Sequence, residues 1–497
     1  MTQSIETIGQ LLAYSAEKYA AKPCIKFVKD AQVISKTYAE FYSDSLSAAA
    51  HILSVLPKKT HIALIGKTSY GYLTYYNGIF ISGNTVVPLA SETDTKELSA
   101  LIEKADVTAV IYDESVKVKV AELLSEKNLI SIEISAPVPC NENIRMAETD
   151  PKDCAMIMFT SGTMGDKKGV MLSSRALVTN VMFREMSYEG DHVALNVLPM
   201  HHVFSFSCDY LKNIKDGVTI CLNGNVENIF ENLLLFEPTF IRLVPMMIET
   251  LLKRIKMTER KNPQLSPREA AERVYGKRLR SIIASGAYLS PKIASEYEKY
   301  GISVRQGYGM TETGPRIAVP NGKTSVYSVG AVIDICDIRI QDGEIQVKSP
   351  SLMSGYYKDP EATEAAFTKD GWFKTGDIGH VEEDGQLYVT GRKKNLIILS
   401  NGENVSPEEI EKKFYGLPFA DELLVYGENN RVIAEFYLSP EYITRNSEET
   451  AKENILQVVN EYNQTAISEK EIADVRFRNI PFEKTASGKI KRKNITF

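Results

Sequence analysis

A short loop after an apolar run has the composition of a phosphate-binding turn. Residues 154–159 are apolar, and hydroxyl, glycine and lysine residues follow from Thr160 to Gly169. Glycine lets the backbone approach an anion closely, and serine, threonine and lysine add donors and positive charge. The loop is not a Walker motif, because no Gly-Lys-Ser/Thr completes it. Taken alone, the loop could equally be a polar surface turn.

A second segment, residues 306–313, combines glycines with an aromatic ring, a hydroxyl and a carboxylate. Tyr308 could stack on a base, Thr311 could contact a phosphate and Glu312 could hold a cation. Magnesium typically uses only one or two protein carboxylates together with substrate phosphates, so a single glutamate is sufficient. The alternative interpretation of this segment is a β-turn with a packed tyrosine.

Two further segments carry single charged residues that suit a nucleotide. Asp377 lies in a Gly-Asp-Ile-Gly sequence, and its carboxylate could accept hydrogen bonds from ribose hydroxyls, while Arg392 could add a forked donor. Lys489 lies in a Ser-Gly-Lys sequence and could present one ammonium group to an anion. An aspartate between glycines is also common in turns, and a basic tail is often only solvated surface.

The order and spacing of these segments resemble the adenylate-forming superfamily across essentially the whole chain. This superfamily contains acyl-CoA synthetases, peptide-synthetase adenylation domains and firefly-type luciferases, and the sequence looks most like bacterial long-chain fatty acyl-CoA synthetases. The first loop resembles the family sequence T-S-G-T-T-G-x-P-K-G-V. Met164 replaces the second threonine and Lys167 replaces the proline, so Lys168 matches the family lysine.

The resemblance implies specific roles for the matching residues. Lys489 is the expected catalytic lysine, Thr311 the α-phosphate contact, Glu312 the carboxylate associated with Mg²⁺, and His202 the residue at the substrate entrance. Thr163 is expected to join Glu312 at the metal. The remaining residues expected to bind the nucleotide or CoA are Thr160, Ser161, Gly162, Lys168, Ser285, Gly286, Ala287, Gly307, Tyr308, Gly309, Asp377, Arg392, Lys394 and Gly402.

The implied reaction has two steps. A carboxylate attacks the α-phosphorus of ATP and expels pyrophosphate, and a thiol, expected to be that of CoA, then displaces AMP from the acyl-adenylate. The small C-terminal domain is expected to rotate about Lys394 between the steps, which exchanges Lys489 for the Gly402 segment. A phosphopantetheine on an acyl carrier protein is the alternative acceptor, and an inactive nucleotide-binding scaffold is a remote alternative.

The segment that borders the acyl site suggests the class of acid. Residues 198–204 resemble the family L-P-x-x-H segment, in which His202 is the matching histidine. Amino-acid-activating domains carry an aspartate just after this segment, but residues 204–207 are Phe-Ser-Phe-Ser. A buried ammonium without a carboxylate is costly, so we expect a medium-chain or long-chain fatty acid. An aryl acid is the alternative, although the asparagine typical of aryl-acid activators is absent.

The elements that must position these residues follow an α/β pattern. Apolar strand-like runs alternate with helical periodicity up to about residue 310, which is typical of mostly parallel sheets with helices on their faces. Short strands follow, with hairpin turns at Asp342-Gly343 and Asp384-Gly385. In the C-terminal part the pattern predicts a helix over 408–416, a hairpin over 422–438 and a helix over 447–464 that begins at Ser447.

We therefore expect a large α/β N-terminal domain with a small β-rich subdomain, followed by a mobile α+β lid. The expected boundaries are residues 1–391 for the N-terminal domain, 392–395 for the hinge and 396–497 for the lid.

The overall composition excludes several other classes of protein. A net charge of -6 over 497 residues argues against a general grip on nucleic acid, which needs a basic surface. Six cysteines without a C-x-x-C pair are typical of a reduced, intracellular protein. No apolar run approaches the roughly 20 residues that span a bilayer, and no secretory signal is visible. We therefore expect a cytoplasmic protein.

Overall fold

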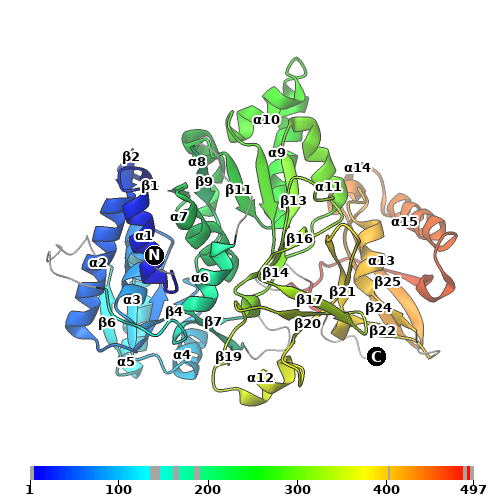
Figure 1. Ribbon diagram of the computed structural model, residues 1–497. Coiled ribbons are helices and arrows are strands. Elements are labelled where there is room, and N and C mark those ends of the chain that lie inside the picture. The colour runs from blue at the N-terminus through cyan, green and yellow to red at the C-terminus, as the bar shows by residue number, and fades with distance from the viewer. Residues whose placement is uncertain are drawn as a thin grey trace. The chain divides into compact units, whose positions relative to one another are not determined.

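The computed structural model describes residues 5–134, 146–160, 167–183, 191–400, 403–484 and 490–492 (Figure 1). Within these ranges the chain forms two compact units. The large unit comprises residues 1–286, 294–337 and 348–373, and the small unit comprises residues 287–293, 338–347 and 374–497. The expected hinge at 392–395 stays a prediction. Five expected site residues lie outside the described residues: Ser161, Gly162, Thr163, Gly402 and Lys489.

Two seven-stranded sheets form the large unit, and both are parallel except at their edges. The first sheet has the order β13-β12-β11-β9-β10-β1-β2, and the second has the order β19-β8-β7-β4-β3-β5-β6. A small sheet has the order β14-β15-β16. These sheets confirm the expected α/β class. Their strands are β1 (Pro23–Lys29), β2 (Gln32–Thr37), β3 (His61–Ile65), β4 (Thr85–Leu89), β5 (Ala109–Tyr112), β6 (Ile130–Glu133), β7 (Cys154–Phe159), β8 (Gly169–Ser173), β9 (Val193–Asn196), β10 (Thr219–Leu222), β11 (Phe240–Leu243), β12 (Ser281–Ala284), β13 (Ser303–Gln306), β14 (Tyr308–Gly309), β15 (Arg316–Val319), β16 (Ala331–Val332) and β19 (Gly355–Tyr356).

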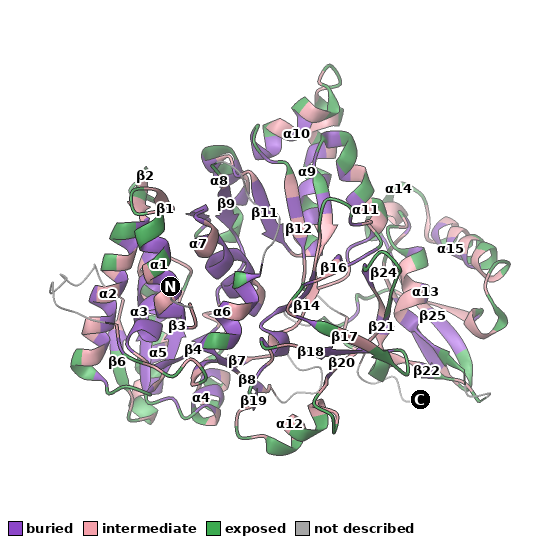
Figure 2. Ribbon diagram, in the orientation of Figure 1, coloured by how far each residue is buried: buried purple, intermediate pink, exposed green. Residues whose placement is uncertain are grey.

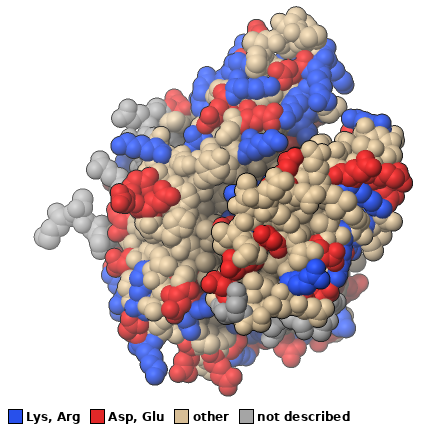
Figure 3. All heavy atoms as spheres, turned by 90° about the vertical axis from the view of Figure 1, so that its right-hand side faces the viewer, with Lys and Arg blue, Asp and Glu red and all other residues tan. Residues whose placement is uncertain are grey.

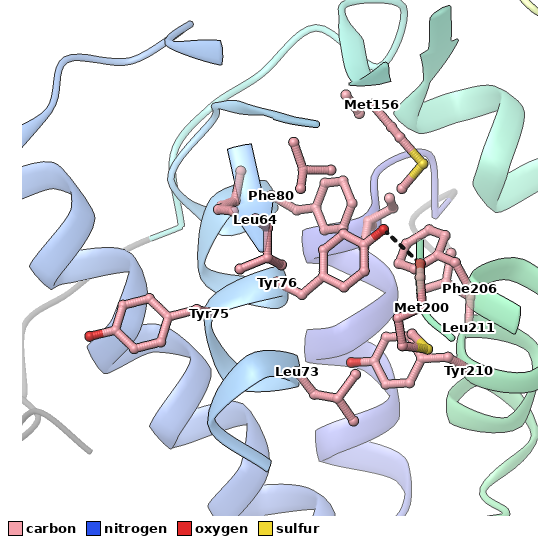
Figure 4. Close-up of a cluster of buried hydrophobic side chains, with 14 of the residues drawn as sticks. Leu64, Leu73, Tyr75, Tyr76, Phe80, Met156, Met200, Phe206, Tyr210 and Leu211 are labelled. Carbon is pink, nitrogen blue, oxygen red and sulfur yellow. Dashed lines mark hydrogen bonds between the residues drawn. The ribbon is translucent and has the colours of Figure 1, made fainter. Parts of the chain in front are cut away.

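One hydrophobic cluster runs from the second sheet through a set of helices to the first sheet. Helix α3 is apolar on all sides, and every residue from Tyr72 to Ile81 is buried, as expected of a core helix. The Tyr76 and Phe206 rings lie 4.7 Å apart in this cluster (Figure 4). The helices that contribute to it are α1 (Ile8–Lys18), α2 (Tyr38–Val55), α3 (Tyr70–Ile81), α6 (Ser174–Met182), a π-helix (Phe204–Leu211) and α7 (Lys212–Asp216).

The other helices of the large unit leave one side to solvent, whereas most strand residues are buried (Figure 2). They are α4 (Thr95–Lys104), α5 (Lys117–Glu126), α8 (Ile229–Phe236), α9 (Pro245–Lys261), α10 (Pro267–Tyr275) and α12 (Pro360–Ala366), while α11 (Pro291–Glu296) begins in the small unit. Acidic and basic side chains are interspersed over much of the face seen in Figure 3. In the described ranges no helix has the length and apolarity to cross a membrane.

The small unit combines a four-stranded sheet, a short hairpin and a three-stranded sheet covered by helices. The sheets have the orders β17-β18-β20-β21, β22-β23 and β24-β25-β26. The elements are β17 (Asp337–Gln341), β18 (Glu344–Lys348), β20 (Phe373–Val381), β21 (Leu387–Arg392), β22 (Ile397–Ile398), β23 (Asn404–Val405), β24 (Ala420–Glu428), β25 (Arg431–Leu438), β26 (Ile472–Arg478), α13 (Pro407–Glu411), α14 (Pro440–Arg445) and α15 (Glu448–Asn463).

Local signals in the small unit are largely confirmed. Asp342 and Gly343 have φ angles of 51° and 73°, as a tight hairpin turn requires. The Ser447 side chain accepts a hydrogen bond from the Thr450 N–H at 3.0 Å, so it is the N-cap of α15. The expected helix over 408–416 is wrong in part, because α13 ends at Glu411 and a tighter 3-10 turn follows.

A buried carboxamide ties three segments of the large unit together. Asn180, on α6, is fully buried, and its Nδ2 donates to the Thr313 and Arg316 carbonyls and to Ser351 Oγ at 3.1–3.2 Å. Its Oδ1 accepts from the backbone N–H of Arg316 at 3.2 Å and from the guanidinium at 3.3 Å. The turn that contains Glu312 is therefore fixed against α6, which directly follows β8.

We expect Asn180→Ala to lower the midpoint of thermal unfolding by at least about 5 °C. The change leaves several buried donors and acceptors unpaired, at about 1–3 kcal/mol each, and 1 kcal/mol is worth roughly 2–4 °C in a large domain. Asn228→Ala is the control, because Asn228 is exposed and its side chain caps no helix. Equal melting curves for the two variants would contradict the role given to Asn180.

Candidate active site

Two of the expected nucleotide-binding segments leave the same edge of the first sheet. β12 and β13 are parallel neighbours, with Ala284 opposite Gln306. Ser285 therefore begins the turn after β12, and Gly307 begins the turn after β13. The Gly307 N–H donates to the Ala284 carbonyl at 2.9 Å, which keeps the two turns together. The carboxyl edge of an open α/β sheet is where ligands of such folds bind.

Tyr308 is held in a strand that only glycine can continue. It pairs with Ala318 on β15, and its side chain is half-buried. A Cβ atom on Gly309 would lie 1.8 Å from the Pro315 carbonyl oxygen, so no other residue fits. The close approach of the two backbones fixes the backbone position of Tyr308 beside β15.

The two ends of the candidate phosphate loop are joined by strand pairing. β7 and β8 are antiparallel, with Phe159 opposite Gly169, and the Thr160 N–H donates to the Lys168 carbonyl at 3.0 Å. Thr160 and Lys168 are therefore brought together as expected. The lysine that departs from the family sequence, Lys167, forms a 2.6 Å ion pair with Glu97.

A residue that the sequence did not point to connects Lys168 with Glu312. The Tyr356 hydroxyl donates to Glu312 Oε1 at 2.9 Å, and the Lys168 ammonium lies 4.6 Å from the centroid of the same ring. Tyr356 lies on β19, which pairs with β8 beside Lys168. Its two partners come from distant parts of the chain, so local sequence carries no signal for this contact.

Glu312 fits the expected role of a magnesium ligand. Its side chain is 8% exposed, and its carboxylate is oriented by the Tyr356 hydroxyl. The described residues contain no group of three or more His, Cys, Asp or Glu side chains placed to hold a metal ion by themselves. A single carboxylate of this kind suits Mg²⁺ that shares its coordination with phosphates. Thr311 lies one residue away in the same 3-10 turn, and its side chain is half-exposed.

His201 and His202 lie close to each other, with ring centroids 4.3 Å apart. Burial, together with the charges of the neighbouring His202 and Lys167, lowers the pKa of His201 to about 3. Partial desolvation also lowers the pKa of His202, against the opposing charge of Glu92. Both rings are therefore neutral at physiological pH. Among the residues that the structure describes, neither ring pairs with a carboxylate, and His202 is the exposed member of the pair.

In the small unit, Asp377 and Arg392 are opposite each other on β20 and β21. Arg392 Nε donates to Asp377 Oδ1 at 2.8 Å, and the carboxylate is nearly buried while the guanidinium is more exposed. The Asp377 N–H donates to Thr375 Oγ1 at 3.0 Å, which fixes the turn before it. The structure therefore brings together these two predicted residues. Lys394 follows in a short 3-10 turn and is exposed, and Ala287 also belongs to this unit.

The residues on either side of the Lys489 segment are firmly anchored. Lys484 and Ile490 form an antiparallel bridge. Arg492 makes a bidentate ion pair with Glu411 at 2.5 and 2.7 Å, and Lys484 pairs with Glu422 at 2.5 Å. Lys484, Ile490 and Arg492, which flank the expected position of Lys489, are thus held within the small unit.

We expect stability to fall as the pH drops from 7 to 5, and to fall less in His201→Asn. The ordinary histidine pKa is 6.5 and that of folded His201 is about 3, so below pH 6.5 the unfolded chain takes up a proton that the folded protein does not. Melting temperatures across this range test the slope, with the exposed His380→Asn as the control. Identical slopes for wild type and His201→Asn would contradict the role of burial.

Two family models match most of the chain. The model of the AMP-binding enzyme family matches residues 12–357, and that of the AMP-binding enzyme C-terminal domain matches residues 394–496. A 2-succinylbenzoate–CoA ligase of Listeria monocytogenes serotype 4b is 30% identical over 450 residues, covering 88% of this chain and 89% of the relative. A long-chain-fatty-acid–CoA ligase of Bacillus subtilis is 25% identical over 497 residues, covering 85% and 83%.

The fold is also that of a solved structure. ATP-bound MatB from Rhodopseudomonas palustris superposes with a TM-score of 0.82 at 23% identity, covering 97% of each chain. The expected superfamily is thereby confirmed, on the residues at the sheet edge and on family matches that cover most of the sequence: the chain belongs to the AMP-binding enzymes.

Proposed function

We propose that the enzyme uses ATP to adenylate a carboxylic acid and then transfers the acyl group to the thiol of CoA. The observation that carries this proposal is that Lys168 and Glu312 both contact the side chain of Tyr356. Glu312 in turn follows the aromatic residue Tyr308 by four positions in the sequence. A lysine, a metal-binding carboxylate and a base-stacking ring are the groups that a metal–triphosphate nucleotide needs. Relatives that are acid–CoA ligases support the reaction class.

The first step brings two anions together, so the site must supply positive charge and donors more than a base. In this proposal Lys168 and Thr311 bind the phosphates, and Lys489 stabilises the charge that develops at the α-phosphate. Magnesium, held by Glu312 and Thr163, would neutralise phosphate charge. Tyr308 stacks on adenine beside the Ser285-Gly286 turn, and Asp377, oriented by Arg392, accepts hydrogen bonds from the ribose.

In the second step, the thiol of CoA must reach the acyl-adenylate, so Lys489 must first leave the site. We propose that the C-terminal lid, residues 396–497, turns about the 392–395 hinge and brings the Gly402 segment to the acyl-adenylate. The anchoring of Lys484 and Arg492, which flank the Lys489 segment, within the small unit supports this proposal. AMP is a good leaving group, so the thiol step needs no further activation of the acyl carbonyl.

The proposed acid is largely apolar, with a fatty acid as the first candidate. Residues 204–207 contain no acid, and the next one, Asp209, is fully buried. Its carboxylate is 3.4 Å from Arg242 Nη1 and accepts from Asn196 at 2.8 Å. Because Asp209 already has these partners, it is not available to a substrate ammonium. An aromatic acid is the second candidate, favoured by the 30% identical relative that acts on 2-succinylbenzoate.

Assaying a panel of acids with ATP, with and without CoA, tests the proposal. We expect AMP and pyrophosphate, and acyl-CoA only when CoA is present, with fatty or aromatic acids at least about 100-fold better than amino acids. Asp377→Ala should weaken ATP binding about 10-fold or more, since a charged hydrogen bond is worth roughly 1.5–3 kcal/mol. Release of ADP and phosphate would refute adenylation, and an amino acid as the best substrate would refute the acid class.

Lys489→Ala and Lys394→Pro should separate the two half-reactions. Losing the ammonium should cost adenylation about 10²–10³-fold, as for other lost transition-state donors, and leave the thiol step nearly unchanged. Proline fixes φ near roughly −65°, so Lys394→Pro should block the rotation and lose thioester formation while keeping much of the adenylation. The assays are acid plus ATP, and synthetic acyl-adenylate plus CoA. Equal damage to both steps in both variants would exclude an alternating lid.

A further inference from the structure

Tyr356 makes two different contacts with opposite charges in the candidate site. Its hydroxyl donates to Glu312 Oε1 at 2.9 Å, and the face of its ring receives the Lys168 ammonium at 4.6 Å from the centroid. Burial raises the pKa of this hydroxyl, and the negative charge of Glu312 raises it further, so the group stays protonated and remains a donor.

The backbone leaves Tyr356 no freedom to shift along β8. It pairs with Val170, and the next residue, Tyr357, donates its N–H to the Gly169 carbonyl at 2.7 Å. Gly355 has φ of 142°, and a Cβ atom there would lie 2.9 Å from Thr363 Cγ2. A slip by one residue would put a side chain where only glycine fits, so the register fixes the backbone position of Tyr356 beside β8.

The contacts keep two opposite charges from neutralising each other. Among the residues that the structure describes, Lys168 forms no ion pair with Glu312 or any other carboxylate, and its ammonium rests on the ring instead. A direct pair would have to be broken before a phosphate could take the lysine and a metal could take the glutamate. The Tyr356 side chain instead contacts each group separately, through its ring face at Lys168 and its hydroxyl at Glu312, so no ion pair between the two has to be broken.

We propose that Tyr356 is a positioning residue for the metal–nucleotide: its hydroxyl orients Glu312 toward Mg²⁺, and its ring holds Lys168 for the phosphates. This inference rests on the proposed function. Outer hydrogen bonds of this kind to a ligating carboxylate typically change metal affinity 10–100-fold when they are removed. The hydroxyl and the ring therefore have separable roles, one toward the metal and one toward the lysine.

The test is calorimetric measurement of ATP affinity on the full-length protein, in excess Mg²⁺ and in EDTA. Tyr356→Phe keeps the ring and removes the hydroxyl, whereas Tyr356→Leu removes both. Tyr357→Phe is the matched control, because its hydroxyl donates to Asp106 on the surface at 2.7 Å. We expect Tyr356→Phe to bind ATP within about twofold of wild type in EDTA but about 10-fold more weakly in Mg²⁺.

The other variants complete the pattern. Tyr356→Leu should weaken ATP binding under both conditions, because Lys168 loses its support, and Tyr357→Phe should match wild type in both. If Tyr356→Phe behaves like Tyr357→Phe, or loses equal affinity with and without Mg²⁺, the positioning role is refuted while the proposed function stands. If wild type itself binds no ATP, the proposed function fails and this inference fails with it.

Discussion

The carboxamide of Asn180 is the interaction on which the geometry of the candidate site depends. It joins the helix after β8 to the turn that contains Glu312 and to Ser351, five residues before Tyr356. Lys168 precedes β8, Glu312 lies in the turn, and Tyr356 follows Ser351, so Asn180 connects the segments that carry these three residues. Because all the partners are buried, none of these hydrogen bonds can be exchanged for water without a large cost. The relative positions of the lysine, the carboxylate and the tyrosine are therefore properties of the core.

Polar groups of the large unit fall into two sets according to what surrounds them. Asp209, Arg242 and Arg316 are buried. Asp209 and Arg242 pair with each other and with side-chain amides, and Arg316 donates to a backbone carbonyl, so all three stabilise the fold. Lys168, in contrast, has only an aromatic face as its partner among the described residues. A charge held so weakly is available to an incoming anion. This contrast separates residues that stabilise the sheet from those that can serve a ligand.

Features encoded within a few residues could be predicted from the sequence. The Asp342-Gly343 turn, the Ser447 cap and the α/β alternation each follow from local composition, and the structure confirms them. The roles of Asp377, Lys168 and Glu312 came from family resemblance. Tyr356 could not be found in either way, because its partners depend on the pairing of β8 with β19. The ion pair of Asp209 with Arg242 was missed for the same reason, since it joins a π-helix to β11.

The Asn180 contacts also have a consequence for synthesis on the ribosome. Arg316 follows Asn180 by 136 residues, and at about 5–20 residues per second this interval lasts roughly 7–27 s. During that time α6 has emerged without the partners that satisfy its buried amide. A nascent chain that ends before residue 316 therefore lacks the Arg316 and Ser351 partners with which the folded protein buries the Asn180 amide.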